Sequence, residues 1–294
     1  MINVKVGGAV AKYDLILLWN IKNKSLINDL QFTYYDMPND CVWNGGRINR
    51  SIDLEQRMVD TYNKLGHGIC LGFTNSVILD LGDPVGNKLL EMITGDNNPN
   101  KLHGVVLCTE TLRRYLRKNF PELKLTYSIT GHPTTDQLFF EGYYKELEEK
   151  YDVIVPKYNH LEEILALMEQ GKLNGSKYEI LINDNCNVNC QFYEEHWAQM
   201  AHINRTISAP WEKDHDLSHQ VEIKPKTKAG PIKKEPTCVQ GNLDVTMLQR
   251  FYDAGVRHFK ISGRDLEDVD FEYQLPTHLA EIQKIEQVSN SIHN

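Results

Sequence analysis

The sequence predicts a (β/α)8 barrel of the TIM type, formed by residues 1–294 as a single α/β domain. Short apolar segments alternate with amphipathic segments, and from about residue 66 they recur roughly every 25 to 35 residues. This alternation implies parallel strands joined by right-handed helical crossovers. An open doubly wound sheet is the alternative, but no Gly-x-Gly-x-x-Gly pattern follows an early strand.

The predicted strands are short runs of mostly apolar residues, many of them β-branched. In chain order they cover residues 3–6, 31–35, 67–74, 103–108, 123–129, 152–155, 178–182 and 257–261, with 219–223 as a further candidate. Eight or nine strands are the number that a closed (β/α)8 barrel requires.

The predicted helices lie between these strands and follow the helical period of apolar residues. They cover residues 53–65, 84–94, 109–119, 135–150, 161–170, 243–255 and 276–291. Asp244 is a plausible N-cap of the helix over 243–255, and Gly255 is a natural helix stop. Residues 204–242 break the rhythm with several prolines and lysines, which predicts a long excursion on the catalytic side of the barrel.

Composition limits the classes of protein that this chain can represent. The net charge of −8 argues against a protein held on nucleic acid by its overall field, so nucleic acid is not the favoured partner. No apolar run is long enough to predict a membrane span, and the N-terminus lacks the pattern of a secretory signal. Six cysteines in a chain of this length indicate free thiols in a reducing compartment, which favours the cytoplasm.

Two cysteines stand where a barrel places its chemistry. Cys186 and Cys190 follow the strand over 178–182, and His196 comes six residues after Cys190. A pair of thiolates can bind zinc or iron, or form a redox couple. Radical SAM enzymes carry Cys-x3-Cys-x2-Cys, but Tyr193 occupies the third position here. Two buried thiols without a ligand role are the structural alternative.

Cys238 is the predicted partner of this pair. Residues that follow different strands of a barrel converge on one face, so Cys186, Cys190 and Cys238 can meet there. Three thiolates would hold a [4Fe-4S] cluster with one iron open or capped by a fourth group. The candidates for the fourth ligand are Cys41, Cys70, Cys108 and His196.

Polar residues at the other strand ends are predicted to bind substrate. Lys260 and Arg264 lie at the end of the strand over 257–261 and suit an anionic group. His196, with two glutamates beside it, is a candidate proton donor. Further candidates are Asn44 and Arg47 in a Gly-Gly turn, and Thr74 and Asn75 after the strand over 67–74. Each group also has a purely structural alternative. Lys260 and Arg264 could form salt bridges at the strand end, Asn44 and Arg47 could belong to a packed turn, and Thr74 and Asn75 could cap a helix.

The segment over 255–264 resembles the signature of the peptidase U32 family, Gly-hydrophobic-x-x-hydrophobic-Lys-Ile-Glu-Gly-Arg. The spacing Asn-x-x-Cys-x-x-x-Cys that ends at Cys186 and Cys190, followed by the later Cys238, is similar to the cysteine region of that family. The resemblance covers roughly residues 150–265. It implies an iron–sulfur TIM barrel, and several members support oxygen-independent hydroxylation of RNA bases or quinone precursors. Ser262 replaces the family's acidic residue, and a second cysteine beside Cys238 is lacking, which indicates a divergent branch.

These observations favour an iron–sulfur-dependent modifying enzyme of the U32-like class. Its reaction would be an oxygen-independent hydroxylation or another group transfer on an anionic small molecule or nucleobase, and a protein partner is also compatible with the charge. Two hypotheses from other classes stay open. One is a non-catalytic scaffold subunit with a structural metal. The other is a mononuclear zinc hydrolase with Cys186, Cys190 and His196 as ligands.

Overall fold

The computed structural model describes residues 1–24, 30–37, 41–45, 53–76, 81–95, 102–132, 140–184, 201, 241–263 and 266–292. Eight strands form one sheet in which every neighbouring pair is parallel. The strands are β1 (Ile2–Gly7), β2 (Leu30–Asp36), β3 (Gly68–Phe73), β4 (Gly104–Leu107), β5 (Lys124–Tyr127), β6 (Val153–Ile154), β7 (Glu179–Leu181) and β10 (His258–Ile261).

The sheet curves into a barrel because its first and last strands meet. β1 pairs with β10, so that Lys5 lies opposite Lys260 and Val6 opposite Ile261. Between β6 and β7 the ladder is reduced to one parallel bridge, from Ile154 to Tyr178. Each strand neighbours the next one along the chain, which is the topology of a (β/α)8 barrel.

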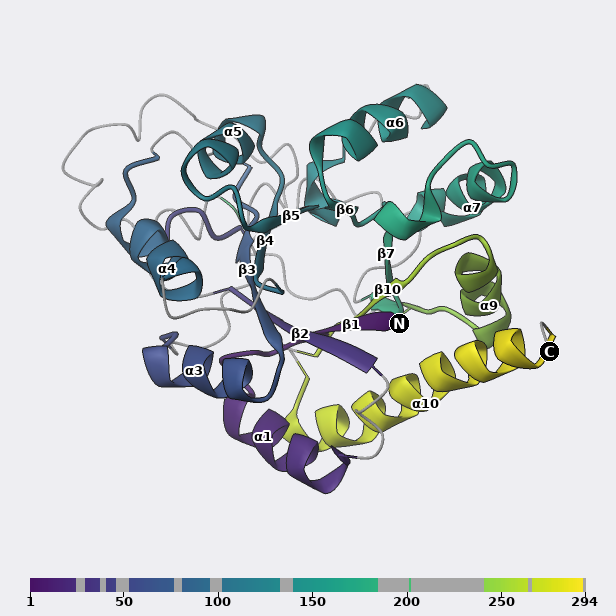
Figure 1. Ribbon diagram of the computed structural model, residues 1–294, viewed down its shortest axis with the longest axis horizontal. Coiled ribbons are helices and arrows are strands. Elements are labelled where there is room, and N and C mark those ends of the chain that lie inside the picture. The colour runs from purple at the N-terminus through teal and green to yellow at the C-terminus, as the bar shows by residue number, and fades with distance from the viewer. Residues whose placement is uncertain are drawn as a thin grey trace, which may run out of the picture.

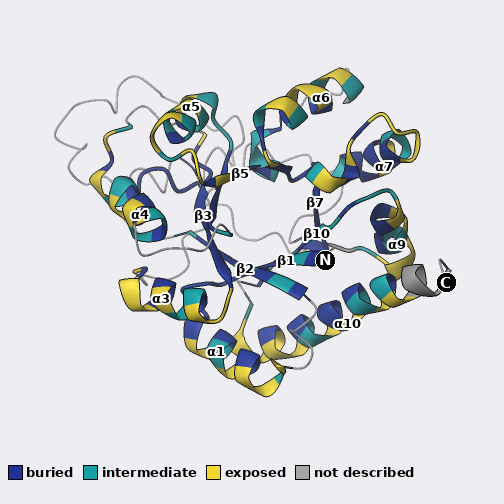
Figure 2. Ribbon diagram, in the orientation of Figure 1, coloured by how far each residue is buried: buried dark blue, intermediate teal, exposed yellow. Residues whose placement is uncertain are grey.

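Within the described ranges, each strand of the barrel is followed by one α-helix on the outside, and together these helices form the outer ring in Figure 1. They are α1 (Tyr13–Lys22), α3 (Gln56–Lys64), α4 (Pro84–Thr94), α5 (Glu110–Asn119), α6 (Phe140–Lys150), α7 (Leu161–Glu169), α9 (Val245–Asp253) and α10 (Asp268–Ile292). The apolar core lies between this ring and the sheet, where Val4, Phe32 and Leu71 pack with helix residues such as Leu112 and Ile282. Figure 2 shows the buried faces of the helices turned toward the strands.

A short antiparallel ribbon stands beyond the end of β7. It is formed by β8 (Asn183–Asp184) and β9 (Gly241–Asn242), and it pairs Asp184 with Gly241. The chain thus leaves the barrel and returns to it at neighbouring points. The predicted excursion over 204–242 therefore ends earlier than expected, because its last two residues are part of this ribbon.

The predicted barrel is confirmed and the open doubly wound sheet is wrong, because β1 pairs with β10 and the bridge from Ile154 to Tyr178 joins the edge strands β6 and β7. All eight principal strand predictions are confirmed, while the candidate over 219–223 lies outside the described residues.

The sequence pattern does not predict helix α1, because its segment is apolar on most sides. The closing helix was expected to begin at Pro276, but α10 begins at Asp268 and contains Pro276 in its interior. None of the helices in the described ranges combines the length and apolar character that crossing a bilayer requires.

Candidate functional site

The carboxyl ends of the strands form the mouth of the barrel, and three predicted substrate residues meet at one part of it. Thr74 and Asn75 follow β3, and Asn44 lies on the loop over 41–45. The Asn75 backbone N–H donates to the Trp43 carbonyl at 2.9 Å. The loop approaches so closely that a Cβ on Gly45 would lie 2.1 Å from the Thr74 carbonyl oxygen. Glycine is required there because any side chain would collide with backbone atoms.

Asn75 is fully buried and joins three segments of the chain. Its Nδ2 lies within hydrogen-bonding distance of the carbonyl oxygens of Val42 (3.1 Å), Asn44 (3.2 Å) and Ala201 (3.1 Å). Ala201 belongs to the chain between β8 and β9, so this contact ties that part of the sequence to the mouth. The Asn75 amide therefore acts as an anchor for the loop and for Ala201.

Cys108 follows β4 beside this anchor. Its Sγ donates to the Thr74 carbonyl at 3.3 Å. Burial raises the pKa of the Cys108 thiol to about 12, and a hydrogen bond with Thr130 offsets only part of this rise. The thiol is therefore protonated at neutral pH in the protein without a metal. The Thr74 hydroxyl is also buried and has no partner among the described residues.

Lys260 is the predicted catalytic residue that the structure describes. It is the third residue of β10, and its side chain is partly buried inside the barrel. The Lys260 Nζ lies 4.1 Å from the centroid of the Tyr35 ring, a cation–π contact. Tyr35 lies in β2 and packs with Cys70 and Val106, which come from β3 and β4. Lys260 therefore adds positive charge to the inside of the barrel, as an anion site requires.

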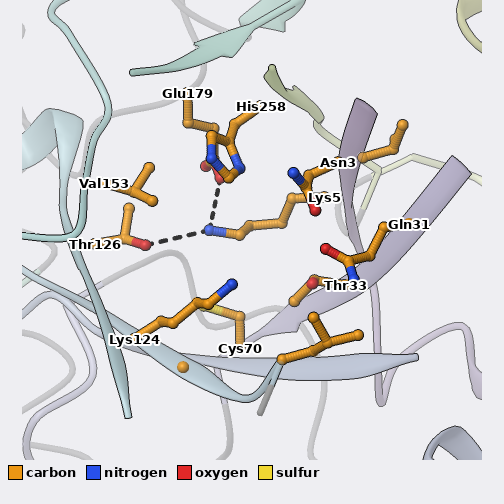
Figure 3. A pocket seen from close by; sticks show the side chains of 13 residues that line it. Asn3, Lys5, Gln31, Thr33, Cys70, Lys124, Thr126, Val153, Glu179 and His258 are labelled. Carbon is orange, nitrogen blue, oxygen red and sulfur yellow. Dashed lines mark hydrogen bonds and ion pairs between the residues drawn. The ribbon is translucent and has the colours of Figure 1, made fainter. Parts of the chain in front are cut away.

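A buried ion pair that the sequence pattern did not reveal lies next to Lys260. Lys5 of β1 binds Glu179 of β7, with 2.7 Å between Nζ and the nearer carboxylate oxygen. Lys5 Nζ also donates to the Thr126 hydroxyl at 3.4 Å. Figure 3 shows Lys5 extending across the barrel between these two partners. The sequence does contain a sign of this ion pair. Lys5 and Glu179 are charged residues within otherwise mostly apolar strands, at positions that face the inside of the barrel.

Both members of this pair are held in their charged forms. Burial by itself raises the pKa of the Glu179 carboxyl, but Lys5 and Lys260 outweigh it, so the pKa lies below its usual value. Burial by itself lowers the pKa of Lys5, but Cys70 and Glu179 outweigh it, so this pKa lies above its usual value. The inside of the barrel thus carries a carboxylate that faces two ammonium groups.

The ribbon at the end of β7 is fixed to the neighbouring strand by a side chain. Asn183 is fully buried, and its Oδ1 accepts from the Ser262 backbone N–H at 2.6 Å. Its Nδ2 donates to the Ser262 carbonyl at 3.0 Å. The Asn183 amide therefore continues the pairing of β7 with β10 by one residue and fixes the base of the ribbon above Lys260.

This architecture also occurs among solved structures. No family model matches the chain, and no curated protein matches its sequence. Among solved structures, the chain is similar to that of the U32 peptidase Mk0906, with a TM-score of 0.51 and 12% sequence identity. The match covers 90% of this chain and 93% of that one. The chain has a U32-like fold. At this level of identity the likeness concerns the fold alone, and it agrees with the fold that the sequence resemblance implies.

The remaining predicted site residues lie outside the described residues. They are the cysteines Cys186, Cys190 and Cys238, together with His196, Arg47 and Arg264. Among the residues that are described, no group of three or more histidine, cysteine or acidic side chains could hold a metal ion. Cys41, Cys70 and Cys108 are free thiols in this part of the chain. The predicted metal site therefore stays a prediction, and Thr74, Asn75, Asn44 and Lys260 are the predicted site residues that the structure describes.

Proposed function

We propose that this chain is an iron–sulfur-dependent modifying enzyme that acts on an anionic small molecule or a nucleobase. The reaction would be an oxygen-independent hydroxylation or another group transfer. The proposal rests on the U32-like fold, on the cysteine spacing of the sequence and on the positive charge at the barrel mouth.

The pairing of Asp184 with Gly241 is the observation that carries this proposal. Along the chain, Cys186 comes two residues after Asp184, and Cys238 comes three residues before Gly241. Such short connections to one ribbon favour a common site for these two thiols, although about fifty residues separate them in sequence. Thiolates are the ligands that iron–sulfur clusters use.

The proposed cofactor fits the chemistry of these donors. Cys186, Cys190 and Cys238 would hold a [4Fe-4S] cluster, which supplies electron transfer or an open iron position when bound. Lys260 would attract the anionic group of the substrate, and Arg264 would add a bidentate donor for a carboxylate or phosphate. The Lys5–Glu179 ion pair lies next to Lys260, which is opposite Lys5 in the neighbouring strand, so these charges are in place before a substrate binds.

Anaerobic purification followed by an absorbance spectrum and by iron, sulfide and zinc analysis tests the proposal. A brown protein with about four irons per chain is the expected result. A colourless protein with one zinc would support the hydrolase alternative and overturn the cluster. A protein free of metal would overturn both.

Cysteine variants locate the metal. Cys186→Ser, Cys190→Ser and Cys238→Ser should each lose most of the bound iron and the visible absorbance. Thr277→Ser, on the exposed side of α10, is the control and should keep the full iron content. Retention of the full iron content in any of the three serine variants would remove that cysteine from the ligand set.

A further inference from the structure

A cavity opens at the amino-terminal end of the barrel, opposite the mouth. Five of its lining residues are the first residues of their strands, namely Gly104, Lys124, Val153, Glu179 and His258. Its volume is about 40 Å³. A water molecule needs roughly 10–15 Å³ of such a cavity, so the cavity has room for about three water molecules.

Glu179 has an oxygen that needs a hydrogen-bond donor. Its side chain is only 2% exposed, and one oxygen binds Lys5. The second oxygen, Oε1, is buried and has no partner among the residues that the structure describes. A buried carboxylate oxygen without a donor is strongly destabilising, so a donor is expected at this position.

The other polar side chains of the cavity can hold such a donor in place. Asn3 and Gln31 contribute amide groups, and Thr33 and Thr126 contribute hydroxyl groups. Figure 3 shows these side chains around the Lys5–Glu179 pair. The barrel interior of this fold is usually filled by branched apolar side chains, so a polar lining at this depth is a departure from the common pattern.

The charges in the cavity select a neutral donor. Lys5 and Lys124 both line the cavity, so a metal cation or an ammonium ion would be repelled. A halide or a fully ionised oxyanion has no proton to donate to Glu179. A water molecule donates to the carboxylate and also accepts from the side-chain amides.

We propose that the amino-terminal half of the barrel is a hydration site, in which about three water molecules complete the coordination of Glu179. The waters connect the buried ion pair with the side chains of Asn3, Gln31 and Thr33. This site is separate from the mouth, and the inference does not depend on the iron–sulfur proposal. The effect of these waters is that Glu179 stays ionised near Lys260 although it is buried.

A high-resolution crystal structure of the full chain, with bromide and thallium(I) soaks, tests the proposal directly. The expected result is density for waters, one of them within hydrogen-bonding distance of Glu179 Oε1, and no anomalous peak in the cavity. A bromide peak near Lys124 would overturn the proposal in favour of an anion site. A thallium peak on Glu179, or a protein side chain that pairs with Oε1, would overturn it as well.

Urea unfolding of a single variant distinguishes a hydrated cavity from a dry one, because the two predict stability changes of different sign. Thr33→Val removes one hydroxyl with little change of shape. If the cavity is hydrated, this variant loses a partner of the waters, and the urea midpoint of unfolding should fall. If the cavity is dry, an apolar side chain is preferred and the midpoint should stay the same or rise, which would overturn the proposal. Thr111→Val, on the exposed face of α5, is the matched control and should leave the midpoint unchanged.

Discussion

At the scale of single residues, the Lys5–Glu179 pair is the most unusual feature of this barrel. Both side chains are buried, and they form an ion pair with 2.7 Å between Lys5 Nζ and the nearer Glu179 oxygen. A buried ion pair adds little net stability, because the desolvation of two charges offsets their attraction. Removal of one partner is different, because it leaves the other charge buried and uncompensated.

Single substitutions of this pair should therefore be severe. Lys5→Met and Glu179→Leu should each lower the free energy of unfolding by about 3–5 kcal/mol, and the double variant should recover much of that loss. Urea unfolding at neutral pH measures the three variants as a double-mutant cycle. The control is Lys145→Met, which breaks an exposed pair with Glu141 and should change stability by less than about 0.5 kcal/mol. Additive single effects would contradict the prediction.

Buried histidines predict a loss of stability in weak acid. Burial lowers the pKa of His67 and His103 to about 4, that of His132 to about 3 and that of His258 to about 4. The unfolded chain binds protons below its ordinary histidine pKa, and the folded chain does not, so stability falls as the pH drops from about 6.5 toward 4.

The slope of this pH dependence can be assigned to one residue. His132→Phe should reduce the slope of the unfolding free energy between pH 6 and 5 by up to about 1.4 kcal/mol per pH unit. Urea unfolding of the variant and of the natural sequence at both pH values measures the difference. Equal slopes would mean that His132 is not held neutral in the folded protein.

At the scale of elements, buried polar side chains fix the loops at the mouth. Asp83 caps α4 by accepting from Val85 N–H and Gly86 N–H, and it also accepts from Val42 N–H in the loop over 41–45. Asn75 holds the same loop from the β3 side. The loop is thus defined by side chain-to-backbone bonds from two neighbouring elements.

Removal of the Asn75 amide should loosen this loop locally. Asn75→Ala leaves buried carbonyl groups without a donor, and we expect a loss of about 2–3 kcal/mol in stability. Hydrogen–deuterium exchange should increase over residues 41–45 and around Ala201, while β1 and β2 stay protected. Unchanged exchange over 41–45 would show that Asn75 does not anchor the loop.

Helix α10 shows how packing overrides a local signal. Phe271, Leu275, Leu279, Ile282 and Ile285 are buried along one face, and this face continues through Pro276. A proline inside a helix removes one backbone donor and costs about 3 kcal/mol relative to alanine, but burial of the apolar face is larger in sum. The Thr277 hydroxyl donates to the Tyr273 carbonyl at 2.9 Å close to the interruption.

Replacement of this proline should stabilise the protein. Pro276→Ala restores a backbone donor in the middle of α10 and should raise the free energy of unfolding by about 1–3 kcal/mol. Urea unfolding measures the change, with Glu272→Ala on the exposed side of the same helix as the control. A lower stability would indicate that the helix is adapted to the proline.

At the scale of the whole molecule, the barrel closes through its own backbone pairing. β1 joins β10 over four residue pairs, and the apolar core surrounds the sheet. None of the strands in this closed sheet contains Cys186, Cys190 or Cys238. The fold is therefore expected to be independent of the proposed metal.

Metal removal separates a catalytic centre from a structural one. Chelation under anaerobic conditions should abolish the visible absorbance and leave the thermal midpoint and the far-ultraviolet circular dichroism nearly unchanged. A large fall of the midpoint would favour the scaffold hypothesis, in which the metal contributes to folding.

The sequence by itself determined the order and type of most elements. The period of apolar residues locates the eight strands and seven of the helices, because each buries one face against the core. It failed at α1, where exposed Leu18 and Ile21 obscure the buried face formed by Tyr13, Ile16 and Trp19. It also failed at the start of α10, where a proline usually marks a helix boundary.

Only the tertiary structure decided how the polar residues combine. Lys5, Thr126 and Glu179 lie on three strands that are far apart in sequence, and barrel closure brings them into contact. Likewise, the Asn75 amide joins the loop over 41–45 to Ala201, which the sequence pattern did not indicate, and a contact of Asn75 with substrate stays a prediction. The physical reason is that periodicity records which face of an element is buried, whereas the partner of a buried polar group depends on which strands become neighbours.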